Sequence, residues 1–250
     1  MTNEQSITLL RKNKQAQIDA FKYVGMVDVD ENTRASEFAK RIKWAGGLLD
    51  LCLACTHTAD GSFHYFTQSE WENIKDKTPF VKRGLRVRAE GHSFILAAID
   101  CDFESAATMI WGPTSAVPGI SSLTCNNAYM DFGGKAATEA IVAAGASGTY
   151  PAAEVAAAYK AYNSVDGIED TSDWHLPGLG VWILICKYWN AIQDSLKNFW
   201  NAAAKLTENS TYWTSTQCAA GTAFTMTSFG NIFATGKGSK CRVRPVCEEI

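Results

Sequence analysis

Cysteine and histidine residues at short spacing are the first candidates for chemistry in this chain. Cys52, Cys55 and His57 lie close together, and His64 follows shortly after them. Thiolates and imidazoles are the tetrahedral ligands of zinc, so such a cluster could hold a metal ion. Cys52, however, continues an apolar stripe at helical spacing, and free cysteine behaves as a small buried hydrophobe. Because no second cysteine pair completes the ligand set, we expect no metal and no cofactor.

Two other histidines, His92 and His175, give no catalytic signal. Each is isolated in the sequence from any Ser, Cys or Asp constellation. A lone histidine is more often a hydrogen-bonded structural residue than a general base. The sequence therefore predicts no catalytic residue, and we expect a protein that is not an enzyme.

Composition and charge exclude several classes of function. The 250 residues are 46% hydrophobic, enough for a buried core, and the net charge of −3 offers no basic footprint for nucleic acid. Neither an export signal nor a run approaching the roughly 18 apolar residues of a membrane span is found. We therefore expect no nucleic-acid partner and no membrane insertion. Most of the eight cysteines should be free thiols.

Helices are expected in the first and middle parts of the chain. Residues 1–24 are interpreted as a helix or an attachment segment, and apolar residues at helical spacing predict an amphipathic helix over residues 33–57. Further helices are expected over residues 68–74, 135–146, 151–163 and 179–199. We accordingly divide the chain into an N-terminal helical or attachment region, residues 1–83, and a ligand-binding domain, residues 84–250.

Short strands are expected on both sides of these helices. The first three are residues 62–66, 84–89 and 93–99, the last two forming a hairpin around Glu90-Gly91-His92. The last four are residues 212–216, 223–228, 231–235 and 241–246. Residues 114–127, rich in Ser, Thr, Gly and Pro, are expected to form a loop. The pattern predicts an α+β fold in which residues 85–99 and 212–246 share one antiparallel sheet, with the helix 179–199 packed on it.

The segment from Gln217 to Cys241 differs in character from its surroundings. It contains small and hydroxyl side chains, glycines and single Phe residues, and neither Asp nor Glu. Strand-forming residues precede and follow it. Side chains of arbitrary type within a rigid framework are expected where they are free to suit a ligand. The segment therefore predicts recognition rather than catalysis, and its lack of carboxylates makes a calcium site unexpected.

Three motifs carry a resemblance to a known family: Trp174-His175-Leu176-Pro177, Tyr212-Trp213-Thr214-Ser215-Thr216 and Arg242-Val243-Arg244-Pro245-Val246. With the order of the expected elements, they resemble the C-type-lectin-fold variable proteins of diversity-generating retroelements, particularly those of gut Bacteroides and their phages. The resemblance extends over about residues 84–246 and implies a C-type-lectin-like fold. In that family, a reverse transcriptase rewrites the closing segment while a β scaffold holds the backbone.

The resemblance thus implies a variable ligand-binding face. We assign to it Gln217, Cys218, Ala219, Ala220, Gly221, Thr222, Thr225, Thr227, Phe229, Asn231, Phe233, Ala234, Thr235, Ser239 and Cys241. Phe229 and Phe233 are expected to be exposed anchors, because aromatic side chains give a large contact area at low entropy cost. The alternative is that Phe224 and Ile232 face inward and that only one Phe is free.

The function that the resemblance implies is receptor binding. We expect a phage tail-fibre component, located in the virion tail after cytoplasmic synthesis, that adsorbs to a bacterial surface receptor, either a protein or a glycan. The alternative is a bacterial, cell-associated lectin-like adhesin at the cell surface. A third candidate is a formylglycine-generating-type oxidase, which shares the fold and uses a cysteine pair that Cys241 and Cys247 could imitate. Activated thiols need an electropositive, partly exposed setting, which favours binding over this chemistry.

A homo-oligomer is the expected assembly. A protein that binds a repetitive cell surface gains most from several weak sites presented together. The amphipathic stripe of residues 33–57 would then join the subunits, for example as a trimer, through residues 1–57. The alternative is that this stripe packs on its own domain.

Overall fold

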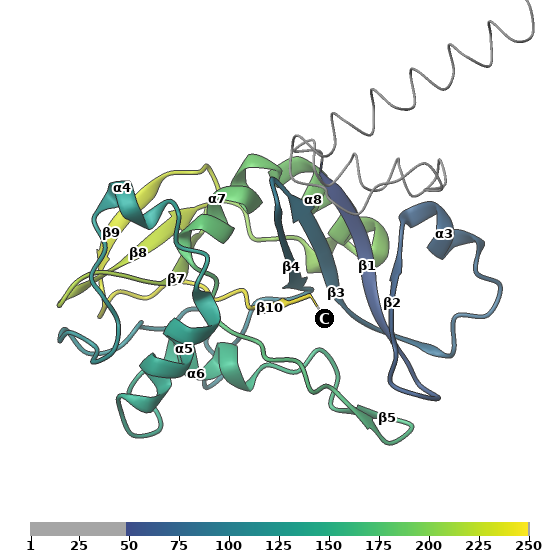
Figure 1. Ribbon diagram of the computed structural model, residues 1–250, viewed down its shortest axis with the longest axis horizontal. Coiled ribbons are helices and arrows are strands. Elements are labelled where there is room, and N and C mark those ends of the chain that lie inside the picture. The colour runs from purple at the N-terminus through teal and green to yellow at the C-terminus, as the bar shows by residue number, and fades with distance from the viewer. Residues whose placement is uncertain (1–48, 250) are drawn as a thin grey trace, which may run out of the picture. The chain divides into compact units, whose positions relative to one another are not determined.

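The computed structural model describes residues 49–249, which combine helices with antiparallel sheets in an α+β fold (Figure 1). The chain divides into two units, and one of them comprises Leu51–Val87 and Ser93–Ile250. The features described below belong to that unit, apart from Asp50 and the hairpin tip Arg88–His92. The helix or attachment segment predicted for residues 1–24 lies outside the described residues, as does most of the helix predicted for residues 33–57.

A five-stranded sheet runs in the order β10-β4-β3-β1-β2. Its strands are β1 (Asp50–His57), β2 (Phe63–Phe66), β3 (Phe80–Ala89), β4 (His92–Ala97) and β10 (Val246–Glu248). β10 comes from the far end of the sequence and pairs antiparallel with β4, with Val246 opposite Leu96. The predicted hairpin is confirmed: Glu90 and Gly91 have φ values of 53° and 82° between β3 and β4, as in the tight turns that suit twisted strands.

The helix predicted to end at His57 is wrong over the described residues, because Asp50–His57 forms strand β1. The run from Cys52 to Thr56 is buried throughout, as in a strand that has neighbours on both edges and covered faces. Periodicity alone does not distinguish such a short apolar run from a buried helix. The boundary expected between residues 83 and 84 falls inside β3, and one sheet joins the residues on both sides of it.

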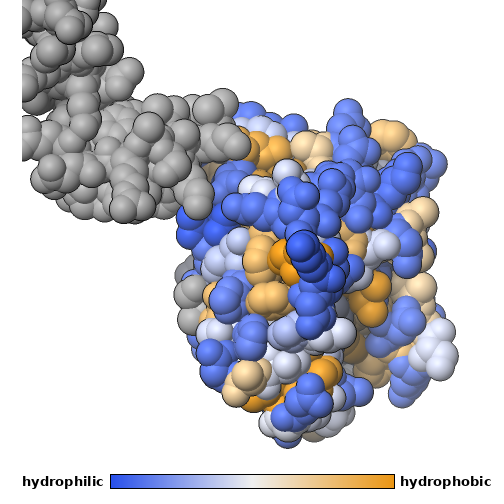
Figure 2. All heavy atoms as spheres, turned by 90° about the vertical axis from the view of Figure 1, so that its right-hand side faces the viewer, coloured by the Kyte–Doolittle hydropathy of each residue, from blue (hydrophilic) through white to orange (hydrophobic). Residues whose placement is uncertain are grey.

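The strand predicted at residues 62–66 and the helix predicted at 68–74 are confirmed as β2 and α3 (Gln68–Asn73). α3 begins with a capping box. Thr67 Oγ1 accepts from the Glu70 amide at 3.3 Å, and the Glu70 carboxylate accepts from the Thr67 amide at 2.8 Å, which satisfies two free helix-end donors. The side of the molecule that carries β2 and α3 is mostly hydrophilic, with apolar residues in separate small patches (Figure 2).

A three-stranded sheet, in the order β7-β8-β9, carries most of the closing segment. It consists of β7 (Thr211–Ala219), β8 (Thr222–Thr227) and β9 (Ile232–Gly236), which confirms the strands predicted there. Trp213 lies opposite Thr225, and Thr225 lies opposite Phe233. This sheet is hydrogen-bonded separately from the five-stranded one. The prediction that residues 85–99 and 212–246 share one sheet is therefore wrong, except that Val246 begins β10.

Residues 241–245, here called the connector, join the two sheets where a strand over residues 241–246 was predicted. Pro245 has no amide hydrogen and so cannot donate a hydrogen bond to a neighbouring strand. Strand β10 accordingly begins directly after it, at Val246. The Arg242 carbonyl accepts from the Trp213 amide of β7 at 2.9 Å, and the Pro245 carbonyl accepts from the Ala97 amide of β4 at 3.0 Å. The connector is therefore bonded to both sheets.

The predicted Ala-rich helices are confirmed as α5 (Gly134–Ala143) and α6 (Pro151–Ala158). The single helix expected over residues 179–199 is instead α7 (Leu179–Lys187) and α8 (Trp189–Phe199), because Tyr188 leaves helical geometry with φ −109° and ψ 24°. α7 packs on the sheet of β7: the Trp182 ring lies 4.6 Å from the Tyr212 ring. Within residues 49–249, none of the helices has the length and apolar character required to span a bilayer.

Arg244 is buried beneath the connector, with only 1% of its surface exposed. Its Nε donates to Asp100 Oδ1 at 2.6 Å, and Arg242 Nη1 donates to the other oxygen of the same carboxylate at 3.2 Å. The remaining Arg244 donors bond the backbone carbonyls of Ala97, Ala204 and Lys205. A buried charge is tolerated when it is paired and fully hydrogen-bonded, and this guanidinium meets both conditions.

Replacing Arg244 by Met is expected to lower the free energy of unfolding by about 3 to 5 kcal/mol, because it leaves the Asp100 carboxylate and several carbonyls without their buried donors. Arg242→Met is the matched control, since the Arg242 side chain is 24% exposed and a partly solvated pair contributes only about 1 kcal/mol. Urea unfolding of the two variants measures the difference. Equal losses would show that Arg244 does not hold the connector.

Candidate functional site

The residues assigned to the ligand face lie on β7, β8 and β9, in the turns between them and, for Ser239 and Cys241, shortly after β9. The exposed members are Ala219, Ala220, Phe229, Asn231, Phe233, Ala234 and Ser239. The half-buried members are Cys218, Gly221, Thr222, Thr227 and Thr235. Phe229 and Phe233 are 73% and 53% exposed, as anchors require, whereas Phe224 is fully buried. In the ladder of β8 and β9, Phe233 lies opposite Thr225 and Ala234 lies opposite Phe224.

Three assigned residues are wrongly placed on the face, because the structure buries them. Gln217 is 1% exposed at the end of the ladder of β7. Thr225, in the central strand β8, is fully buried and its hydroxyl bonds that of Thr235 at 2.7 Å. Cys241 is 6% exposed and exchanges backbone hydrogen bonds with Met109. All three belong to the framework under the face, where side chains have defined partners.

Gln217 holds the segment of residues 113–123 against the sheet. Its Oε1 accepts from the Val117 amide at 3.1 Å, and its Nε2 donates to Ser122 Oγ at 3.2 Å. The Gln217 carbonyl also accepts from the Leu123 amide at 2.9 Å. A buried amide with these bonds fixes a loop that has no helix or strand of its own.

Lys237 completes this support from below. It is fully buried, and its Nζ donates to the Ser115 carbonyl and to Gln217 Oε1, both at 2.7 Å. The ammonium also lies 4.4 Å from the centre of the Trp111 ring, a favourable position for a cation over an aromatic face. Burial lowers the pKa of Lys237 to about 8. No carboxylate is among these contacts, so the support beneath the face is built from amide, carbonyl and aromatic groups.

The other end of this loop meets the edge strand β9. After the short helix α4 (Cys125–Ala128), Tyr129 lines a hollow of about 460 Å³ together with residues of α7, β8 and β9. Ile183, Met226 and Ile232 form its apolar wall, and Lys187 of α7 also lines it. The sequence analysis described residues 114–127 as a loop and did not assign them to the face. The signal that could have included them is a lack of charge, because neither 113–130 nor 217–236 contains Asp, Glu, Lys or Arg.

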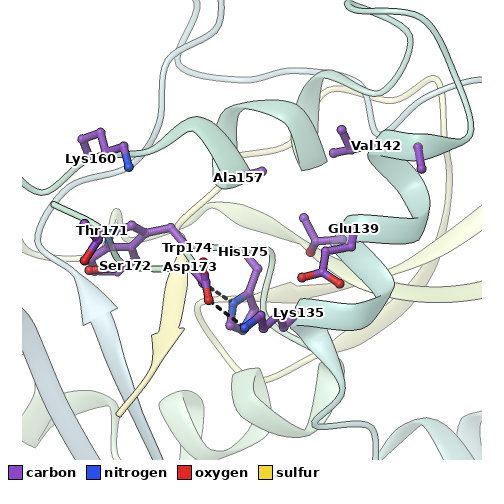
Figure 3. Close-up of a pocket in the computed structure, with 12 residues that line it drawn as sticks. Lys135, Glu139, Val142, Ala157, Lys160, Thr171, Ser172, Asp173, Trp174 and His175 are labelled. Atoms are coloured by element: carbon purple, nitrogen blue, oxygen red, sulfur yellow. Dashed lines mark hydrogen bonds and ion pairs between the residues drawn. The ribbon is translucent and has the colours of Figure 1, made fainter. Parts of the chain in front are cut away.

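A separate polar pocket of about 460 Å³ is formed by α5, α6 and residues 171–175 (Figure 3). Lys135 Nζ pairs with Asp173 Oδ2 at 2.7 Å, and His175 Nδ1 donates to the Asp173 carbonyl at 2.8 Å. Burial lowers the pKa of His175, so its imidazole is neutral at neutral pH. Glu139, one helical turn beyond Lys135, also lines the pocket. The pocket can take a small polar molecule, but none of the assigned face residues lines it.

The cysteines considered for chemistry are buried. Cys52 and Cys55 are three residues apart in β1, so their side chains point to opposite faces of the sheet. Among residues 49–249, no group of three or more His, Cys, Asp or Glu side chains could hold a metal ion. Burial raises the pKa of Cys241 to about 11 and that of Cys247 to about 12. Both are protonated at neutral pH, unlike an activated thiol.

Comparison with known proteins gives no relative: no family model, no curated protein and no solved structure matches this chain. The function is therefore inferred from the geometry of the described residues and from the sequence motifs.

The Lys237 amine provides a pH test of the framework. Its pKa is about 8 in the folded protein and 10.5 as the ordinary value. Between these values the unfolded chain binds more protons than the folded protein, so stability must rise with pH. We expect the free energy of unfolding of the wild type, minus that of Lys237→Met, to increase from about pH 8 to 10.5. Urea unfolding at several pH values measures this difference. A pH-independent difference would mean that Lys237 is not held in a desolvated site.

Proposed function

We propose that this protein is a receptor-binding protein with a C-type-lectin-like fold, whose exposed side chains between residues 218 and 239 recognise the ligand. The observation that carries the proposal is the division of roles within one short stretch of chain. Trp213, Gln217 and Thr225 are buried and hydrogen-bonded, whereas Phe229 and Phe233, which follow them in the chain, are exposed. Exposed substitutions usually change stability by no more than about 0.5 kcal/mol. Such a face can vary while the backbone stays fixed.

The motif residues support the resemblance to the variable proteins of diversity-generating retroelements. Trp174 is buried and its Nε1 donates to Asp170 Oδ2 at 2.9 Å. Tyr212 is buried and its hydroxyl donates to Asp100 Oδ2 at 3.2 Å, on the carboxylate that also binds Arg244. Tyr212 and Arg244, from two of the motifs, thus meet at the Asp100 carboxylate, whereas Trp174 packs with Ala54 and Ile95 of the five-stranded sheet. A scaffold that supports variable positions requires this arrangement.

A phage tail fibre is the location that we favour, with a bacterial surface adhesin as the alternative. Both use the same face, so the two differ in genome context. Neighbouring tail genes together with a reverse transcriptase and a template repeat of the closing segment would identify the phage protein. The oxidase alternative is disfavoured because burial raises the pKa values of both Cys241 and Cys247.

Adsorption to cells tests the proposal. The fluorescent full-length chain should bind at least one strain in a panel of gut Bacteroides. The triple variant Ala219→Tyr, Asn231→Tyr and Phe233→Ser changes exposed face residues. It should lose binding to that strain by about tenfold or more, as for the loss of an interface hot spot, and its melting temperature should stay nearly the same. Flow cytometry and thermal unfolding give the two readouts.

The matched control for this experiment changes exposed residues of α3. This control also replaces three exposed side chains, but on the helix that follows β2 of the five-stranded sheet: Ser69→Tyr, Glu72→Ser and Asn73→Tyr. Adsorption should be unchanged in this variant. Binding by no strain would contradict the receptor-binding function. Equal losses in the two triple variants would contradict the location of the face.

We also propose that the protein is a homo-oligomer, but the residues expected to join the subunits have changed. Residues 50–57 form strand β1 within the sheet, so they do not continue the amphipathic helix that was expected to join subunits. The residues still available for that role are 1–48, outside the described part. Light scattering on the full chain should give a mass above that of one chain. A monomer that still adsorbs to cells would end the assembly proposal and leave receptor binding intact.

A further inference from the structure

The polar pocket of α5, α6 and residues 171–175 is a second candidate site, and none of its lining residues belongs to the ligand face. We propose that it binds a small zwitterion, a molecule of amino-acid or short-peptide type that carries both an ammonium and a carboxylate group. The site is independent of receptor binding, because it uses different residues. The pocket volume of about 460 Å³ lies in the usual range of small-molecule sites, about 300 to 1,000 Å³.

One end of the pocket is acidic. The Lys135 ammonium on α5 is already paired with the Asp173 carboxylate at 2.7 Å. Glu139, one turn further along α5, is exposed, lines the pocket and forms no ion pair within residues 49–249. The hydrogen bond to Asp173, and further the charges of Glu248 and Glu139, raise the pKa of Lys135, so several carboxylates lie near one ammonium. This end has an excess of negative charge, which the ammonium of a ligand would balance.

His175 adds a hydrogen-bond acceptor next to the acidic end. It is 7% exposed and lines the pocket, and its ring lies between the Asp173 and Glu139 side chains in Figure 3. Because Nδ1 donates to the Asp173 carbonyl at 2.8 Å, the neutral ring carries its hydrogen on Nδ1 and has a lone pair on Nε2. Within the described part of the chain, no donor bonds Nε2. Such a lone pair is suited to accept from a ligand ammonium.

The other end of the pocket is basic. Lys160 follows α6, and its Nζ donates to the backbone carbonyl of Asp170 at 2.6 Å. Lys160 is exposed, and no carboxylate of residues 49–249 forms an ion pair with it. Figure 3 shows Lys160 on the opposite side of the pocket from Glu139, with Trp174 and His175 between them. Lys160 can therefore receive the carboxylate of a ligand whose ammonium lies at Glu139.

The two unpaired charges select the class of ligand. The wall between them is apolar and includes Val142 of α5, Ala157 of α6 and Trp174. A ligand with a single charge would displace water from the opposite end without replacing it, which is unfavourable. A neutral ligand would satisfy neither end. A zwitterion with a short aliphatic part is complementary to both ends and to the wall.

Calorimetric titration of the full-length chain with free amino acids, ω-amino acids and dipeptides tests the inference. At least one of these zwitterions should bind. Its N-acetylated analogue lacks the ammonium and its C-amidated analogue lacks the carboxylate, so each should bind at least about tenfold more weakly. Which compounds bind shows whether the ligand is an amino acid or a peptide.

Substitutions at the two ends assign each charge. Glu139→Gln should weaken the zwitterion about tenfold and leave the N-acetylated analogue unaffected, whereas Lys160→Gln should weaken the zwitterion similarly and leave the C-amidated analogue unaffected. Glu208→Gln and Lys240→Gln are the matched controls, because both residues are exposed outside the pocket, and they should not change the affinity. In nitrogen NMR spectra, the ring resonances of His175 should shift on binding, and those of the other histidines should not.

Several results would overturn the inference. If no zwitterion binds at millimolar concentration, or if the acetylated and amidated analogues bind as tightly as the parent compound, the pocket does not recognise paired charges. Equal losses of affinity in Glu139→Gln and Glu208→Gln, or a His175 resonance that does not shift, would place the binding elsewhere. Cell adsorption depends on the ligand face, so a failure here leaves the proposed function intact, and a failure of adsorption leaves this site intact.

Discussion

The hydrogen bonds of Arg244 lie where the connector passes between the two sheets. The Ala97 carbonyl is at the end of β4, the Ala204 carbonyl follows α8, and Asp100 also receives the Tyr212 hydroxyl of β7. The guanidinium therefore bonds the end of β4 and the segment after α8 directly, and it is linked to β7 through Asp100. Each buried acceptor left without a donor would cost about 1 to 3 kcal/mol. A lysine could not reach these acceptors together, because only the planar fork of arginine presents donors in these directions.

The contacts of Lys237 and Gln217 beneath the face differ in chemistry from the ion pair of Arg244 and Asp100. Lys237 is satisfied by two carbonyl-type oxygens and the Trp111 ring, without a carboxylate partner among these contacts. At neutral pH the Lys237 ammonium is itself a charge beneath the face. Substitutions by uncharged residues at the exposed positions should therefore be nearly additive, whereas an added charge would interact with Lys237. The framework can then remain constant while the face varies.

The sequence predicted the elements with strong local signals and missed those decided by tertiary contacts. Strands β7, β8 and β9, the capped helix α3 and the Pro-initiated α6 follow from local residue types. Asp50–His57 was assigned to a helix because apolar residues up to Cys52 recur at helical spacing, and only its neighbours on both edges make it an inner strand of the sheet. Gln217 and Thr225 were assigned to the face because they lie in the closing segment that the resemblance implies is variable. Their hydrogen bonds to Lys237 and Thr235 depend on strand register and loop position, which periodicity does not give.

The ligand face has a structural disadvantage, because β9, which carries part of it, is an edge strand of its sheet. Edge strands with exposed apolar residues and no charge tend to pair with other chains, and many proteins prevent this with lysine or proline on the edge. β9 has neither, since either a charge or a rigid ring would alter the recognition surface. The short length of β9 instead limits its pairing with other chains. The strand has 5 residues, begins after Gly230 in a left-handed turn with φ 81°, and ends where Lys237 turns into the protein. A longer β9 of the same composition would favour strand addition over side-chain recognition, so the buried Lys237 both supports the loop and limits the edge.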